Sequence, residues 1–92
     1  MVGVKYDDDK IRYDLIHPEA LKEFAQVLTF GSKKYDDDNW KKVPGLKKRY
    51  TGACMRHFEA YRSGELLDPE SGLPHLAHAM CCIMFLMWKG EK

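Results

Sequence analysis

Three histidines and three carboxylates in the second half of the chain could hold a divalent cation. His75 and His78 are three residues apart, so on a helix they lie on one face. His57 precedes them on another predicted helix, which an antiparallel hairpin would place alongside. Converging imidazoles and carboxylates are ligands for divalent metals, and we predict a metal site from six residues: His57, Glu65, Asp68, Glu70, His75 and His78. The alternative is that each imidazole is a hydrogen-bonded core residue.

Two other chemistries have weaker support in this region. A zinc site through His75, His78 and Cys81 or Cys82 matches none of the strong Cys/His spacings. Ser71 lacks the strand-to-helix elbow of a serine nucleophile, so it is better interpreted as a turn or capping residue.

The run KYDDD occurs twice, at positions 5–9 and 34–38. The similarity stops with these five letters, so it does not indicate an internal repeat. Neither copy alternates oxygen ligands with spacers or supplies a turn glycine, which argues against a calcium loop. Aspartates favour local hydrogen bonds to the backbone, so both runs are predicted to be solvated turns.

The second KYDDD run lies in a basic segment. Seven lysines and arginines fall between positions 33 and 49, interrupted by three aspartates. This segment is either a solvated loop or a surface that faces phosphate, and the sequence leaves both open. The formal net charge of the whole chain is +1, so we expect no direct DNA binding.

Three helices are predicted to position these residues. Pro18 suits the first position of a helix, and apolar residues follow at helical spacing until Gly31, which we expect to end that helix or break it nearby. Further helices are predicted over 46–62 and 75–89. Residues 1–16 are predicted to form an irregular arm before a helical body at 17–90. The predicted fold class is all-α: a small bundle of three main helices in a single domain, 1–92.

The last predicted helix is apolar on nearly every side, which suggests that a second subunit covers part of it. We therefore expect a homo-oligomer that completes a small core. Its apolar run, HLAHAMCCIMFLMW, is shorter than the ~20 residues of a membrane span, so we expect no membrane association. Three cysteines without a disulfide framework and a start without a signal-like segment favour a cytoplasmic location.

Four runs carry a family resemblance: KIRYDLIHPEAL, VLTFGSKKYDDDNW, MRHFEAYRSGE and DPESGLPHLAHAM. They resemble the phage dATP/dGTP diphosphohydrolase-like family, which is related to MazG-type all-α nucleotide pyrophosphohydrolases. The resemblance implies an oligomeric enzyme of the host cytoplasm that acts on purine deoxynucleoside triphosphates. Water would attack the α-phosphorus and release pyrophosphate. A divalent metal, Mg or Mn with Zn as a further option, would assist.

The resemblance also implies roles for particular side chains. The catalytic residues would be His57, Asp68, His75 and His78, with Glu65 and Glu70 as supporting carboxylates. Phosphate contacts would come from Lys10, Arg12, Lys33, Lys34 and Arg56. Tyr35, Asn39 and Trp40 would receive the base. Independently of the resemblance, we predict that Tyr6 and Lys10 begin an arm that folds over a neighbouring helix or subunit.

One departure from MazG-type enzymes affects the metal. Those enzymes resemble one another in two acidic pairs, E-x-x-E and E-x-x-D, whereas this chain has His75-Leu-Ala-His78 and Arg56-His-Phe-Glu59. Histidines favour manganese, zinc or another softer ion over magnesium. They are also compatible with no metal catalysis, and Glu59 is interpreted as a solvent-facing residue.

Two alternatives of other classes therefore stay open. One is a non-catalytic oligomeric sponge that sequesters a nucleotide immune signal and so acts against host defence. A sponge needs complementary charge and a stacking surface but no metal cluster. The other is a structural or adaptor protein without a nucleotide ligand.

Overall fold

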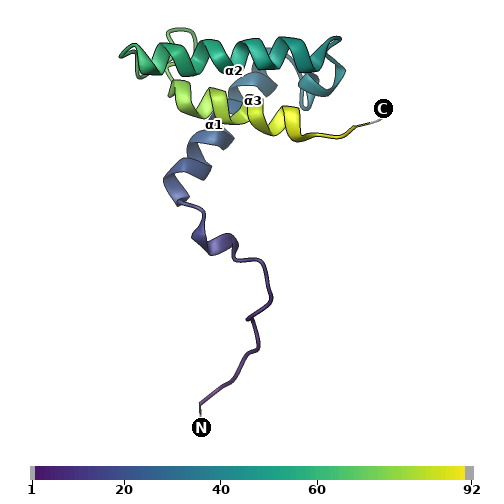
Figure 1. Ribbon diagram of the computed structural model, residues 1–92, viewed down its shortest axis with the longest axis vertical. Coiled ribbons are helices and arrows are strands. Elements are labelled where there is room, and N and C mark those ends of the chain that lie inside the picture. Colours follow the sequence, from purple (N-terminus) through teal and green to yellow (C-terminus); the bar gives the residue numbers. More distant parts are fainter. Residues whose placement is uncertain (1, 91–92) are drawn as a thin grey trace.

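The computed structural model describes residues 2–90, which are largely helical (Figure 1). The α-helices are α1 (Pro18–Lys34), α2 (Leu46–Arg62) and α3 (His75–Met87), and two short 3-10 helices are η1 (Tyr13–Leu15) and η2 (Asn39–Lys42). Across residues 2–90 the only extended pairing is an isolated bridge between Leu67 and Pro74. The all-α prediction with three main helices is confirmed.

Helices α2 and α3 form an antiparallel hairpin, and α3 also packs against α1 (Figure 1). The core lies between α1 and α3, where Val27, Ala77 and Cys81 are buried. Four partly buried apolar residues surround them: Phe24, Leu28, Leu73 and Phe85. The small side chains of Ala77 and Cys81 let α3 approach α1 closely.

The helix boundaries follow local chemistry, with one difference from expectation. Pro18 is the first residue of α1, and α2 has the predicted bounds. Gly31 does not end α1, which continues to Lys34; the Gly31 carbonyl accepts the Tyr35 N–H at 2.9 Å in the last turn. A glycine inside a helix costs only about 1 kcal/mol, so packing of the preceding turns on α3 can outweigh it. Helix α3 ends two residues before the predicted position 89.

The connector between α2 and α3 is a turn tied to the start of α3. Gly64 has a φ of 106°, a left-handed conformation that favours glycine, and it turns the chain after α2. The Asp68 N–H donates to the Leu73 carbonyl at 2.8 Å, and the His75 N–H donates to the Leu66 carbonyl at 3.0 Å. These bonds place the side chains of the connector beside the first turn of α3.

The N-terminal arm extends away from the helices (Figure 1). Residues 2–12 are all exposed. The few apolar side chains of the arm are separated by glycine, aspartates and lysines, so the arm has no continuous apolar face to bury. The expectation that it folds over a helix of its own chain is therefore wrong, whereas contact with another subunit stays a prediction.

Helix α3 carries a second apolar face that the rest of residues 2–90 leaves partly exposed. Four side chains on this face are at least 40% exposed: Leu76, Met80, Ile83 and Met87. Their spacings of four, three and four residues place them in one stripe along the helix. Among the described helices, none has the length and apolar character needed to cross a membrane.

Candidate active site

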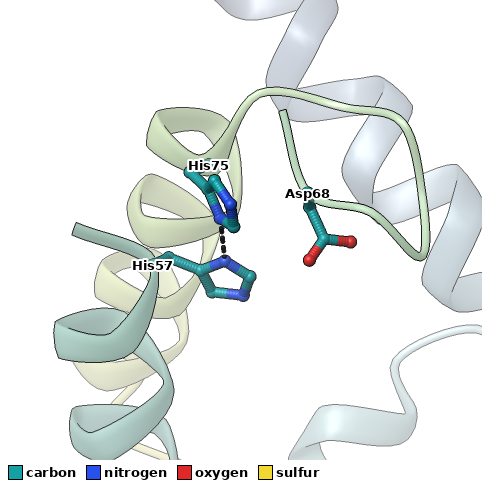
Figure 2. Close-up of side chains that lie close together, drawn as sticks. All are labelled: His57, Asp68 and His75. Carbon is teal, nitrogen blue, oxygen red and sulfur yellow. Dashed lines mark hydrogen bonds between the residues drawn. The ribbon is translucent and has the colours of Figure 1, made fainter. Parts of the chain in front are cut away.

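Two imidazoles and one carboxylate converge where the hairpin meets its connector (Figure 2). His57 comes from α2, His75 is the first residue of α3, and Asp68 comes from the connector. One ligand atom from each residue lies within 4.8 Å of the other two. The Nδ1 atoms of His57 and His75 are 2.9 Å apart and share a hydrogen bond. The structure thus brings together three of the six residues predicted to bind metal.

Glu65 contacts the opposite edge of His75. The Nε2 atom of His75 lies 2.6 Å from Glu65 Oε1, and the His75 side chain is buried whereas Glu65 is half-exposed. Both ring nitrogens of His75 therefore have a partner, Glu65 on one side and His57 on the other. Glu65 binds a histidine of the cluster and does not itself belong to the cluster.

His78 is held by Ser71 and Asp68 of the connector. Asp68 Oδ2 accepts the backbone N–H of Ser71 at 2.9 Å and its hydroxyl at 3.0 Å. The Ser71 oxygen accepts the Leu73 N–H at 3.1 Å, and His78 Nε2 lies 2.7 Å from it. The Ser71 hydroxyl donates its proton to Asp68 and accepts the Leu73 N–H with one of its two lone pairs. The second lone pair accepts the His78 Nε2–H. Asp68 Oδ2 lies 3.8 Å from His78 Nε2, the same nitrogen that contacts Ser71, so these residues do not form a serine-nucleophile triad, in which the carboxylate binds the other nitrogen.

Stacking joins His78 to the cluster. Its ring lies parallel to that of His57, with centroids 4.6 Å apart and an interplanar angle of 10°. Burial lowers the pKa of His57, and the neighbouring His78 lowers it further. Burial also lowers the pKa of His78, against the opposing effect of Asp68. Both rings are therefore favoured in the neutral form that ligates metals and accepts protons.

Asp68, unlike His57 and His78, is favoured in its charged form. Partial burial disfavours its ionised form, but the two hydrogen bonds from Ser71, together with the nearby His78 and His57, outweigh this effect and hold the pKa of Asp68 below its usual value. The site therefore pairs neutral imidazoles with an ionised carboxylate.

A cavity of about 550 Å³ opens beside this site. Its wall includes three of the predicted catalytic residues: His57, Asp68 and His78. His75 is not part of the wall but contacts His57, which is. Four of the predicted nucleotide-binding residues also line the cavity: Lys34, Tyr35, Asn39 and Trp40. The other four do not line it: Lys10, Arg12, Lys33 and Arg56. Arg12 instead pairs with Asp14 at 2.6 Å on the exposed arm.

The charged side chains of the cavity wall are mostly acidic. Lys34 is the single lysine in the wall among the described residues, against five carboxylates: Asp36, Asp37, Asp38, Asp68 and Glu70. Lys34 forms an ion pair with Glu70, which joins the end of α1 to the connector. Glu70 therefore pairs with the ammonium group of Lys34, and it lies outside the cluster of His57, Asp68 and His75.

Trp40 and Tyr35 differ in how much of each ring is free. The Trp40 ring stacks on Phe85 of α3 at a centroid distance of 4.4 Å and meets Trp88 edge-on at 5.3 Å. Tyr35 is 59% exposed, and the Lys34 ammonium lies 5.3 Å from its ring centroid. Trp40 thus fixes η2 against α3, whereas Tyr35 presents the more accessible aromatic ring.

Sequence reasoning missed two features of the site. Ser71 was interpreted only as a turn or capping residue, although it also binds His78. The aspartates of the second KYDDD run were interpreted as solvated turn residues, although they line the cavity. The signal for Ser71 was its place between Asp68 and His78. The five letters themselves do not distinguish the two runs, and the fold carries the aspartates of the second run to the cavity.

The fold and the site define a class: a small all-α protein with an imidazole and carboxylate cluster at the wall of a cavity. The chain belongs to the dATP/dGTP diphosphohydrolase family, because the family model described as "dATP/dGTP diphosphohydrolase, N-terminal" matches residues 2–92. A dATP/dGTP diphosphohydrolase of Salmonella phage PMBT28 is 39% identical over 89 residues. The alignment covers 96% of this chain and 30% of that relative. No solved structure matches the chain.

Proposed function

We propose that the protein binds a purine deoxynucleoside triphosphate in the cavity beside His57 and hydrolyses it to a monophosphate and pyrophosphate. The observation that carries this proposal is that the cluster containing His57 and Asp68 faces a cavity of about 550 Å³. Cavities of this size accommodate small-molecule ligands. Family membership supports the substrate class. The chain spans 30% of its relative's length, so activity of this part alone belongs to the proposal.

The donor set fits a divalent cation. His57, His75 and Asp68 would hold it, and a mixture of nitrogen and oxygen donors suits Mn²⁺ or Zn²⁺ better than Mg²⁺. A bound cation would neutralise phosphate oxygens and lower the pKa of the attacking water. The acidic cavity wall also favours a cation, because five carboxylates would repel a free polyphosphate.

Residues of the chain would orient the nucleotide. Lys34 can bind phosphate oxygens of the substrate when its ion pair with Glu70 breaks. Tyr35 can stack on the base with its exposed ring, and the half-buried Asn39 can donate and accept hydrogen bonds at the base edge. Trp40 would shape the cavity from its place against Phe85.

Sequestration of a nucleotide without hydrolysis is the second candidate. The cavity and Tyr35 would serve a sponge equally well. The acidic wall favours the enzyme, since a sponge without a cation would lack charge complementarity to a polyphosphate.

A second copy of the chain is the proposed cover for the apolar stripe on α3. The stripe residues recur at four, three and four residues, the spacing of a helix that packs along a parallel or antiparallel partner. Met55 and Phe58 of α2 are also exposed and add apolar surface. Two such hairpins packed together would form a bundle with a larger core.

Turnover of each deoxynucleoside triphosphate with Mn²⁺, Zn²⁺ or Mg²⁺, followed by chromatography of monophosphate and pyrophosphate, tests the proposal. We expect products from dATP or dGTP and their loss in Asp68→Asn. Glu59→Gln is the matched control, because Glu59 is exposed on α2 and pairs with Arg62. If the protein binds nucleotide but shows no turnover with any of the three cations, sequestration without hydrolysis is favoured.

A further inference from the structure

His75 is the most enclosed polar side chain of the site. It is 4% exposed, and each of its ring nitrogens faces a different group. Nε2 lies 2.6 Å from the Glu65 carboxylate and Nδ1 lies 2.9 Å from His57 Nδ1. A buried imidazole with two partners has its tautomer fixed by what those partners can donate or accept.

The partners give this hydrogen-bond chain one direction when both imidazoles are neutral. An ionised carboxylate only accepts, so His75 must donate its Nε2–H to Glu65. Its Nδ1 then has a lone pair and no proton. The short contact with His57 therefore requires His57 to donate its own Nδ1–H, which leaves a lone pair on His57 Nε2. Figure 2 shows this nitrogen on the side of the ring away from His75.

We propose that Glu65 is a positioning residue that holds His75 as the Nε2–H tautomer and so directs the His75 Nδ1 lone pair at His57 and Asp68. In the cation-free protein this lone pair accepts the His57 Nδ1–H. With a divalent cation this lone pair would be a ligand, and the His57 proton would pass from Nδ1 to Nε2 by exchange with water, so that His57 stays neutral and frees its own Nδ1 lone pair. The statement that His75 ligates a cation rests on the proposed function, whereas the tautomers assigned to His75 and His57 do not.

This assignment gives Glu65 a role different from that of a metal ligand. In metal sites a ligating histidine usually donates its second N–H to a carboxylate, and loss of that carboxylate lowers metal affinity about 10- to 100-fold. Glu65 has this relation to His75, since it contacts the nitrogen that faces away from His57 and lies outside the three-residue cluster.

Nitrogen-15 NMR of the imidazoles in cation-free protein, at a pH where the histidines are neutral, tests the assignment. We expect His75 as Nε2–H and His57 as Nδ1–H, the minor tautomer of a free histidine side chain. In Glu65→Gln the amide can donate as well as accept, so we expect His57 to lose its single Nδ1–H form. Glu59→Gln, another glutamate substitution near the end of α2, should leave both tautomers unchanged.

Calorimetric titration with Mn²⁺ or Zn²⁺ provides the second readout. We expect Glu65→Gln to weaken binding about 10- to 100-fold and Glu59→Gln to leave it unchanged. A protonated His75 Nδ1, or a His57 tautomer that does not respond to Glu65→Gln, would overturn the proposal. If no cation binds to wild-type protein, the metal part of the proposed function fails, and the tautomers still decide the role of Glu65. Circular dichroism confirms that each variant is folded.

Discussion

The Nδ1 atoms of His57 and His75 lie 2.9 Å apart, so a hydrogen bond joins the second helix to the first residue of the third. Replacing His75 by Ala would leave the Nδ1–H of His57 without a partner and open a small void. We expect a loss of about 1–3 kcal/mol in the free energy of unfolding, measured by denaturant titration. His17→Ala on the exposed start of α1 should change stability little, and equal effects of the two would refute a structural role for this bond.

Substitution of Trp40 should affect mainly stability, whereas substitution of Tyr35 should affect mainly ligand binding. Trp40→Ala removes the ring that stacks on Phe85 and meets Trp88, so we expect a stability loss of about 2 kcal/mol. Tyr35→Ala removes a mostly exposed ring and should leave the melting temperature nearly unchanged while weakening nucleotide binding. Thermal unfolding and equilibrium binding of both variants check the contrast. Equal nucleotide affinity of Tyr35→Ala and wild type would remove Tyr35 from the site.

The ion pair between Lys34 and Glu70 distinguishes two roles for Glu70. As the partner of Lys34, Glu70 competes with substrate phosphate, so Glu70→Gln should lower KM and Lys34→Gln should raise it, each up to about fivefold. As a metal ligand, Glu70 would instead be needed for turnover. Steady-state kinetics of both variants separates these cases, because a loss of kcat in Glu70→Gln contradicts the ion-pair role.

The apolar stripe on α3 predicts a concentration-dependent assembly. Ile83→Glu places a charge in the middle of the stripe, so we expect it to shift sedimentation from dimer or higher oligomer to monomer. Lys48 is exposed on α2, so Lys48→Glu is the control and should leave the assembly unchanged. Identical sedimentation of wild type and Ile83→Glu as monomers would remove the second copy as the cover of this stripe.

The lowered pKa values of His57 and His78 predict a loss of stability in mild acid. An unfolded histidine takes up a proton near pH 6.5, whereas burial keeps these two neutral to lower pH. The unfolded chain then binds more protons, so the free energy of unfolding falls as the pH drops below about 6.5. His78, His75 and Arg56 oppose protonation of His57, whereas Asp68 favours it. Asp68 and Glu70 favour charge on His78, whereas His75 opposes it.

Denaturant unfolding between pH 5 and pH 8 in the presence of a chelator measures this effect. His78→Gln should flatten the dependence, whereas His17→Gln should not, because His17 is exposed at the start of α1. A flat profile in the wild type would contradict the buried, neutral histidines.

Much of the fold could be predicted from local patterns. The bounds of α2 and the start of α1 at Pro18 were predicted correctly because apolar periodicity and proline chemistry are local. The end of α1 was not, because packing on α3 carries the helix past Gly31. The arm, expected over a neighbouring helix or subunit, extends away from the helices of its own chain, since no apolar face anchors it there, and contact with a subunit stays a prediction.

The sequence by itself determined the helical hairpin and the residue types that meet at its connector. It placed His75 and His78 on one face and Asp68 in a turn nearby. Tertiary structure alone decided the partners: Glu65 on His75, Ser71 on His78 and Glu70 on Lys34. The physical reason is helix register, because a shift of one residue rotates a side chain by about 100° around the helix. Only the packed hairpin fixes which nitrogen faces which oxygen.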